Sequence, residues 1–460
     1  MREKLPFNPK EIDDFARYYG FHYDCIDKAS LLRDFCVDME RGLRGESSSM
    51  PMIPSHLSPV YSAPAGKTVV AFDAGGTNLR VSRVQFDESG RPVPVITERA
   101  PMPGTRGRLS AEEFYDALAH TAAPCFKDGG EIAGIGFCFS YEMTVTKDGD
   151  GIPTAMSKEV DAPEVMGKSL GAGLRGALKK LGIHAPERII FLNDTTATLL
   201  SGIAQIPARY ADKTTDGSPL AKDRIGIESG EVMGFILGTG LNTAYPEKNI
   251  PKIGFSSNER PQIIVAESGA YNPRCLGRLD REFDALTTQP GFHTLEKAAA
   301  GAYLGPLSLY IIKKAVEEKL LRFEKQDELL AMPKLETRDL NEFLHRPLAL
   351  EGRLGSLFSK NEHGVIAALC YLESIITERA ALLAAGLIAG TAERIEAGYD
   401  PLRPFRIAIE GTTYVRYHHI RESIEARLRE LLCRDTPRFY ITATVDQASL
   451  FGAAVGALSL

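Results

Sequence analysis

The sequence has no tryptophan, no pair of cysteines at C-x-x-C spacing and no H-E-x-x-H motif. Its seven cysteines are scattered, a pattern that favours reduced thiols in a cytosolic protein over a disulfide framework. His418 and His419 are adjacent, but no Cys or carboxylate cluster stands near them at ligand spacing. We therefore predict a cytoplasmic protein that folds without disulfides and without a structural metal.

Long hydrophobic runs and an excess of positive charge are also missing. The longest apolar run, residues 380–390, falls well below the roughly 20 residues that span a bilayer, and its place within a long helical pattern predicts a core helix. The N-terminal segment MREKLPFNPKEIDDF lacks the apolar core of a signal peptide. With 54 Lys and Arg against 60 Asp and Glu, the net charge is −6, which argues against a general nucleic-acid binder. We expect neither a membrane span nor a nucleic-acid partner, and the oligomeric state is left open.

What the sequence does contain is typical of a large globular enzyme. Its 460 residues are 44% hydrophobic and 25% charged, and at about 150 residues per domain they suggest two large domains or three smaller ones. Both halves show an apolar strand, a Gly/Thr turn and a return strand, which suggests two related α/β lobes that face each other. The string Gly171–Gly176 matches the dinucleotide pattern G-x-G-x-x-G but lies in a predicted helix, residues 168–181, so we interpret it as a small-residue helix face.

Three Gly-rich turns follow predicted strands. They are Asp73–Asn78 after residues 68–72, Gly238–Gly240 after residues 231–237, and Gly411–Thr413 after residues 405–409. Glycine allows a backbone to approach an anion, and turn N–H groups and Thr hydroxyls donate to phosphate oxygens. Each turn alone is most simply a hairpin turn, but three together favour a nucleotide site. No P-loop or protein-kinase motif is present.

Two acidic residues extend this interpretation. Asp73 would repel a phosphate unless Mg²⁺ lay between them, although an Asp that bonds its own turn is the simpler alternative. Asn193 and Asp194 follow a predicted strand, residues 188–192, and precede a helix that should begin near Thr195. Ligands of open α/β sheets bind beyond the carboxyl ends of such strands. Either Asn193 or Asp194 simply caps the helix, or Asp194 is a general base for a substrate hydroxyl.

Six segments in fixed order together resemble the hexokinase/glucokinase family. They are FDAGGTNLRV (72–81), GFCFSYE (136–142), FLNDTTATLLSG (191–202), GFILGTGLNTAY (234–245), AESGAY (266–271) and PGFHTLEK (290–297). The resemblance implies an α/β, two-lobed actin-like (ribonuclease H-like) ATPase fold with a cleft between a small and a large domain. Residues 66–193 plus 447–460 would form the small domain, and residues 1–65 plus 194–446 the large one.

The same resemblance implies ATP-dependent phosphorylation of a hexose at its 6-hydroxyl, with D-glucose as the first candidate and Mg-ATP as the donor. Asp194 would be the general base and Lys158 a second catalytic residue. The sugar would be bound by Ser140, Ser157, Lys158, Asn193, Asp194, Asn242, Glu267 and Glu296. The nucleotide would be bound by Asp73, Gly75, Gly76, Thr77, Asn78, Thr239, Gly411, Thr412 and Ser449, with Asp73 holding Mg²⁺ through water.

Departures from the family pattern keep other functions open. Met156 and Ser268 stand where the family usually has Trp, and Ala302 stands where a Lys is usual. Glu410-Gly-Thr replaces a DGS segment, and residues 447–452 lose glycines near the nucleotide, so donor preference could differ. The alternatives are a non-catalytic sugar sensor with a degraded nucleotide site and an actin-like ATPase without a sugar. A repressor-type homologue lacks support, because we find neither a Cys-rich zinc segment nor an N-terminal helix-turn-helix.

Overall fold

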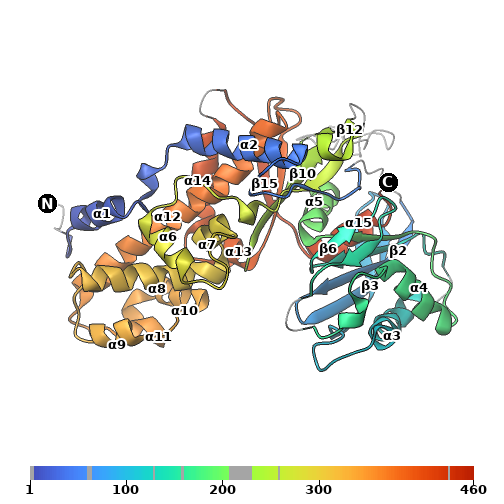
Figure 1. Ribbon diagram of the computed structural model, residues 1–460, viewed down its shortest axis with the longest axis horizontal. Coiled ribbons are helices and arrows are strands. Elements are labelled where there is room, and N and C mark those ends of the chain that lie inside the picture. Colours follow the sequence, from blue (N-terminus) through green and yellow to red (C-terminus); the bar gives the residue numbers. More distant parts are fainter. Residues whose placement is uncertain are drawn as a thin grey trace.

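The computed structural model describes residues 5–59, 65–127, 130–156, 160–206, 231–256, 260–433 and 436–459. These residues form two lobes, one built on a five-stranded sheet and one on a six-stranded sheet with many helices (Figure 1). The α/β, two-lobed architecture is the one that the sequence predicted.

The smaller lobe is built on a sheet of strand order β4-β3-β2-β5-β8. Its strands are β2 (Thr68–Gly75), β3 (Asn78–Phe86), β4 (Pro92–Pro101), β5 (Ile135–Phe139) and β8 (Ile189–Leu192). Strands β2, β3 and β4 are antiparallel, whereas β5 lies parallel to β2 and β8 parallel to β5. The sheet therefore joins a hairpin to two parallel strands that end at the same edge.

Successive side chains of β2 point to opposite faces of this sheet. Val70 and Phe72 pack in the core beneath α3 (Ala111–Ala122) and α4 (Leu170–Lys180). Val69 and Ala71 pack on the other face, in a core that includes α15 (Ala448–Gly456). Because both faces are covered, residues 69–72 of β2 are apolar without interruption, which gives this strand a clear sequence signal.

The larger lobe repeats the arrangement with a sheet of order β1-β13-β10-β9-β14-β15. Its strands are β1 (Ile53–Pro54), β9 (Val232–Leu237), β10 (Leu241–Glu247), β13 (Gln262–Val265), β14 (Phe405–Glu410) and β15 (Tyr440–Thr444). Strands β9 and β10 form an antiparallel hairpin, and β14 lies parallel to both β9 and β15. Two smaller hairpins pair β6 (Met143–Val145) with β7 (Gly151–Pro153) and β11 (Asn249–Ile250) with β12 (Phe255–Ser256).

Helices make up most of the larger lobe (Figure 1). They are α1 (Pro9–Tyr18), α2 (Lys28–Arg44), α6 (Arg278–Ala285), α7 (Thr294–Ala299), α8 (Gly301–Glu317), α9 (Gln326–Ala331), α10 (Thr337–His345), α11 (Gly352–Gly355), α12 (His363–Arg394), α13 (Thr412–Arg416) and α14 (Ile420–Leu432). By length and composition α12 could cross a membrane, but 94% of its apolar window is buried inside the protein. It is the central core helix, as the sequence predicted for residues 380–390.

Helix α5 (Asp194–Gln205) connects the lobes, because it follows β8 of the smaller sheet and packs on β9 and β14 of the larger one. It also lies beside α15 (Figure 1). Gly452 allows this close approach, since a Cβ there would lie 2.0 Å from the carbonyl oxygen of Ala197. The exact domain boundaries at residues 66, 194 and 447 remain a prediction.

Several local predictions need correction. Asp73 and Ala74 belong to β2 itself, so the first turn is shorter than predicted, with Asp73 paired to Arg80 across the hairpin. The chain between α2 and β2, which has no strand signal in its sequence, contributes the short strand β1 to the larger sheet. The turn at Gly411 leads into α13 rather than into a return strand. Gly171–Gly176 lies inside α4, which confirms the helical interpretation.

Candidate active site

Asn193 and Asp194 lie where the chain passes from β8 into α5. Asn193 is the N-cap, and its side-chain oxygen accepts a hydrogen bond from the Thr195 N–H at 2.7 Å. Asp194 is the first residue of the helix, and its Oδ1 accepts from the same N–H at 2.7 Å. Because Asn193 performs the capping, Asp194 is not required for that role.

The surroundings of Asp194 make it more basic than an ordinary aspartate. Burial raises the pKa of Asp194, and the charge of Asp73 adds to this effect. Hydrogen bonds from Thr195 and Asn193 act in the opposite direction. A carboxylate with a raised pKa, held at the carboxyl end of a strand, has the properties of a general base.

A second group of polar side chains lies at the end of the β9–β10 hairpin. The Asn242 Nδ2 on β10 donates to Oε1 of Glu267 at 3.0 Å. The Asn242 oxygen accepts from the backbone N–H groups of Thr243 at 2.7 Å and Ser268 at 3.3 Å. This network fixes the orientation of the Asn242 amide, which in turn positions the Glu267 carboxylate.

Glu267 follows β13 with a left-handed backbone (φ 55°), a conformation that costs free energy for a side chain of this kind. Burial raises the pKa of Glu267 to about 7, and the charges of Asp194, Glu296 and Glu142 contribute to the shift. Glu267 of the larger lobe is therefore close enough to Asp194, at the end of β8, for their charges to interact.

Glu296 approaches the same group from the first turn of α7. Its Oε2 accepts a hydrogen bond from the Leu241 N–H at 3.1 Å. Two glycines leave room for this carboxylate, because a Cβ at Gly240 or Gly269 would lie 2.8 or 3.0 Å from Oε2. Burial raises the pKa of Glu296. The three residues predicted for sugar binding in this lobe, Asn242, Glu267 and Glu296, are thus gathered around one hairpin.

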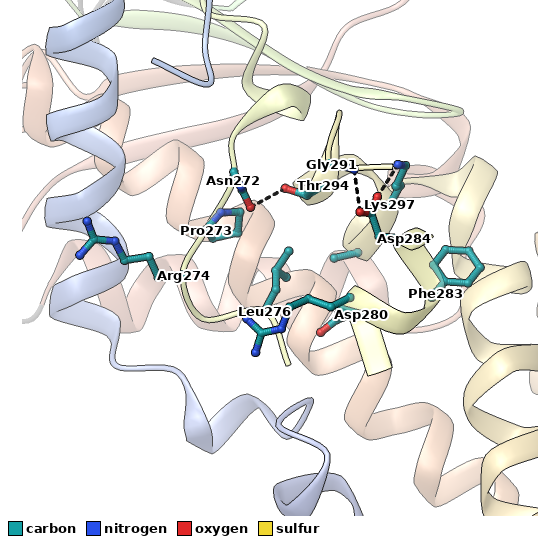
Figure 2. Close-up of a pocket in the computed structure, with 12 residues that line it drawn as sticks. Asn272, Pro273, Arg274, Leu276, Asp280, Phe283, Asp284, Gly291, Thr294 and Lys297 are labelled. Atoms are coloured by element: carbon teal, nitrogen blue, oxygen red, sulfur yellow. Dashed lines mark hydrogen bonds and ion pairs between the residues drawn. The ribbon is translucent and has the colours of Figure 1, made fainter. Parts of the chain in front are cut away.

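Side chains of Thr294 and Lys297 hold α7 against neighbouring segments (Figure 2). The Lys297 ammonium bonds to Asp284 at 2.5 Å and to the Gln289 carbonyl at 2.6 Å. The Thr294 hydroxyl reaches Oδ1 of Asn272 at 3.0 Å. These contacts, which border a cavity of about 380 Å³, hold α7 so that Glu296 stays against Leu241.

The β2–β3 hairpin forms the predicted phosphate side. The Arg80 guanidinium bonds to Oδ2 of Asp73 at 2.7 Å and to Oε1 of Gln447 at 3.1 Å. The turn glycine Gly76 has φ 53° and is exposed, together with Thr77 and Asn78, so its N–H groups can face a ligand. Arg80 thus supplies a positive charge next to the hairpin.

On the facing lobe, two turns are held against each other. The Thr413 hydroxyl donates to the Gly238 carbonyl at 2.7 Å, and the Gly301 N–H donates to the same oxygen at 2.9 Å. Gly411 has φ 126°, and a Cβ there would lie 2.2 Å from the Leu237 carbonyl oxygen, so only glycine fits. Thr239 and Thr412 remain exposed at this edge.

Glu410 connects the predicted base with the nucleotide side. The Thr198 hydroxyl lies 3.0 Å from Oε2 of Glu410 and 3.0 Å from the Asp194 carbonyl oxygen. Burial raises the pKa of Glu410 to about 7, and the charges of Asp194 and Asp73 add to the shift. A hydroxyl carries a single proton, so a protonated Glu410 satisfies this arrangement by donating to Thr198.

Of the remaining predicted residues, the structure describes two serines but not Ser157 and Lys158. The Ser140 hydroxyl lies beside the first turn, 3.3 Å from a Cβ built at Gly75. Ser449 is in the first turn of α15, and its hydroxyl is hydrogen-bonded to the buried Cys138 thiol. Ser157 and Lys158 lie outside the described residues, so their predicted roles remain predictions.

Sequence reasoning missed some residues that the structure adds to the site. Arg80 belongs to the segment FDAGGTNLRV (72–81) and lies two residues after its Gly-Gly-Thr-Asn turn. A cation so close to a predicted phosphate turn is a signal from which its role could have been predicted. Gly240 and Gly269 carry no such signal, because their importance depends on Glu296, which is distant in the chain. Gln447, the partner of Arg80, was noted only as a departure from the family pattern.

Taken together, the fold and site define a class of protein. Each sheet carries a Gly-rich hairpin that suits phosphate, and the acids and amides around Glu267 suit the hydroxyls of a polyol. The class is that of two-lobed phosphotransferases that act on a hydroxyl group of a sugar.

Comparisons with known proteins give the family. Two family models, both described as hexokinase, match residues 15–204 and 232–459. Hexokinase-2 of Candida albicans is 28% identical over 433 residues, which cover 87% of this chain and 82% of that protein. Hexokinase-2 of the horse, Equus caballus, is 25% identical over 445 residues, which cover 92% of this chain but 46% of that protein. The solved hexokinase of Schistosoma mansoni has the same fold, with a TM-score of 0.71 at 22% identity, covering 98% of this chain and 99% of that one.

The chain therefore belongs to the hexokinase family. Its general reaction is the transfer of a phosphoryl group from ATP to a hexose, which confirms the predicted family, enzyme class and phosphoryl donor.

Proposed function

We propose that this hexokinase phosphorylates D-glucose at the 6-hydroxyl, with Asp194 as the general base. The observation that carries the proposal is the electrostatic coupling of Asp194 to one acid on the predicted sugar side and another on the predicted phosphate side. The charge of Asp194 raises the pKa of Glu267 on the predicted sugar side, and the charge of Asp73 on the predicted phosphate side raises the pKa of Asp194. A hydroxyl bound between the two groups would be in reach of the base and of the phosphoryl group.

Phosphoryl transfer requires alignment and charge stabilisation more than covalent chemistry from the protein. Asp194 would accept the proton of the 6-hydroxyl as its oxygen attacks phosphorus. The carboxylates of Glu267 and Glu296 would accept hydrogen bonds from the other hydroxyls, and the amides of Asn193 and Asn242 would donate. A site of this kind discriminates strongly against analogues that lack a hydroxyl, because a buried polar partner is then left unpaired.

The choice of glucose is supported by the solved hexokinase of Schistosoma mansoni, which is described as complexed with glucose. That protein shares the fold, and the acids and amides gathered around the β9–β10 hairpin here suit the same ligand. Mannose and fructose are the alternatives that an assay must separate.

A magnesium ion fits the phosphate side. Mg²⁺ usually keeps several waters and binds through one or two carboxylates plus substrate phosphates. Asp73 offers one half-buried carboxylate beside the hairpin, with Oδ2 bonded to Arg80. No cluster of three or more metal-binding side chains occurs among the described residues, so a cage made of protein alone is not indicated. Mg²⁺ would neutralise charge on the transferred phosphoryl group.

Closure of the lobes on the sugar is part of the proposal. The predicted sugar ligands are divided between the lobes, since Asn193 and Asp194 follow β8 whereas Asn242 and Glu267 belong to the β10–β13 side. A hexose that contacts both sets would draw the lobes together and exclude water, which otherwise competes as the phosphoryl acceptor.

The test is a coupled assay of ADP formation with glucose, mannose and fructose, in which glucose should give the highest kcat/KM. Asp194→Asn should lower kcat by about 100-fold or more while glucose still binds. Asp148→Asn, the same change in an exposed turn, is the matched control and should leave kcat unchanged. Near-normal turnover by Asp194→Asn with intact sugar binding would remove Asp194 from this role, and ADP formation without any sugar would favour the simple ATPase.

A further inference from the structure

Gln447 stands where the chain passes from the larger lobe to the smaller one. Strand β15 pairs with β14 of the larger sheet, and α15 packs on β2 and β5 of the smaller sheet. Between β15 and α15, Gln447 has a left-handed backbone (φ 47°, ψ 41°), which costs free energy for a residue with a side chain. A glycine would adopt this backbone without that cost, so the glutamine side chain needs a reason of its own.

The main chain of this crossover is held on both sides of Gln447. Before it, the Val445 N–H donates to the Ile409 carbonyl of β14 at 3.1 Å. After it, the N–H groups of Leu450 and Phe451 donate to the Gln447 carbonyl at 3.0 Å. These bonds use backbone atoms alone, so a change of the Gln447 side chain leaves them in place.

The side chain of Gln447 does not cap the helix that follows it. Gln447 is the N-cap residue of α15, yet its amide makes no hydrogen bond to the first turn of that helix. It reaches the β2–β3 hairpin instead, where its Oε1 accepts from Nη1 of Arg80 at 3.1 Å. Because a guanidinium has only donors, the oxygen of the amide is the atom that must face it. The amide thus joins the crossover between the lobes to the predicted phosphate hairpin.

Gln447 is one of two anchors of the Arg80 guanidinium. The other is Asp73, whose Oδ2 accepts from Nη2 at 2.7 Å. Two contacts fix the plane of a guanidinium, whereas a single contact leaves it free to rotate. The position of this cation matters to a second acid as well, because burial raises the pKa of Glu410 and the charge of Arg80 acts against that shift. A guanidinium has five N–H donors, so others remain for the oxygens of a phosphate.

We infer that Gln447 is a positioning residue for the phosphoryl donor. Its amide oxygen keeps the Arg80 guanidinium beside Asp73 and so places a positive charge for the phosphates of Mg-ATP. Phosphoryl transfer depends on alignment and charge stabilisation, and a guanidinium that has lost one of two anchors supplies both less well. Gln447 acts through Arg80 and not by contact with a substrate. The inference rests on the proposed place of Mg²⁺ and the phosphates beside Asp73, but not on the choice of hexose.

Two variants remove the contact in different ways. Gln447→Met keeps the length of the side chain without the amide oxygen, and Gln447→Asn keeps an amide that suits the left-handed backbone but is one methylene too short. In both, the KM for Mg-ATP and the calorimetric Kd for Mg-ADP should rise about three- to tenfold, whereas the KM for the preferred hexose should change less than about twofold. Gln85→Met, the same change at an exposed position of β3, is the matched control and should alter none of these constants.

The dependence on Arg80 separates positioning from a general structural effect. Arg80→Lys keeps the charge but not the two-point contact, so the KM for Mg-ATP should rise here too. Adding Gln447→Met to Arg80→Lys should then cause no further rise, because contacts within one network are not additive. An unchanged KM for Mg-ATP in Gln447→Met, an equal rise of both KM values, or full additivity in the double variant would overturn the inference. If Arg80→Lys also binds Mg-ATP normally, the proposed phosphate side fails together with the inference.

Discussion

The affinity of the enzyme for its sugar should depend on pH through Glu267. The pKa of this carboxyl is raised to about 7 in the sugar-free protein. An ionised carboxylate accepts hydrogen bonds from sugar hydroxyls with both oxygens, whereas the protonated form has one fewer acceptor site and a proton that must be placed. Because the pKa of an acid is raised, the competent form is lost as pH falls through 7, and binding should weaken on the acid side.

The magnitude follows from the position of the pKa. With a pKa of about 7, roughly one Glu267 in eleven is ionised at pH 6 and about ten in eleven at pH 8. If only the ionised form binds, the Kd for glucose should be about tenfold higher at pH 6 than at pH 8, which is ~1.4 kcal/mol. Glucose binding near pH 6 should also release close to one proton.

Calorimetric titration with glucose, without nucleotide, measures both quantities in two buffers of different ionisation enthalpy. Glu267→Gln should bind glucose more weakly and with a flat pH profile. Glu410→Gln is the matched control, because the Glu410 pKa is also raised to about 7 but its carboxyl lies on the nucleotide side. A wild-type affinity that does not change between pH 6 and pH 8, or a full pH dependence in Glu267→Gln, would refute the reasoning.

Two further predictions concern named positions. Gly240→Ala places a Cβ 2.8 Å from Oε2 of Glu296 and should raise the KM for glucose about tenfold with little change in the KM for ATP, whereas Gly176→Ala, which meets no atom within 4 Å, should change neither. Glu373→Gln should stabilise the protein at pH 8, because burial raises the Glu373 pKa from 4.5 to about 8 and the folded state therefore loses stability as pH rises from 4.5 to 8. Thermal unfolding should show a free energy of unfolding about 1–3 kcal/mol higher in the variant at pH 8, and no difference near pH 4.

The parts of the fold that the sequence predicted are those that depend on neighbouring residues. The strand ending at Leu192, the cap at Asn193 and the hairpin around Gly76 each lie within one short segment. Their signals are apolar runs followed by Gly, Thr or Asn, and burial on both sheet faces makes such runs continuous. The same is true of α12, whose long apolar run is almost wholly buried.

The rest depends on contacts between distant segments. Strand β4 alternates weakly because it lies at a sheet edge with Val93 and Val95 exposed, so its sequence does not stand out. Asn242 and Glu267 are paired only because β10 and β13 are adjacent. The space that Gly240 leaves for Glu296 exists only once α7 has packed against the hairpin. Pairing and packing of this kind have no local sequence signal.

The crowding of carboxyl groups in the site has a physical consequence for function. Burial raises the pKa of Asp194, Glu267, Glu296 and Glu410. Repulsion from neighbouring acids, with Asp73 among them, adds to the shift for all of these except Glu296. Arg80 is the cation that the structure bonds directly to the fifth acid, Asp73. Hydroxyl donors from a hexose and positive charge from Mg²⁺ are the two things that would relieve this repulsion. If Asp194 is the base, as proposed, hydroxyl donors from a hexose and the positive charge of Mg²⁺ would each favour its ionised form.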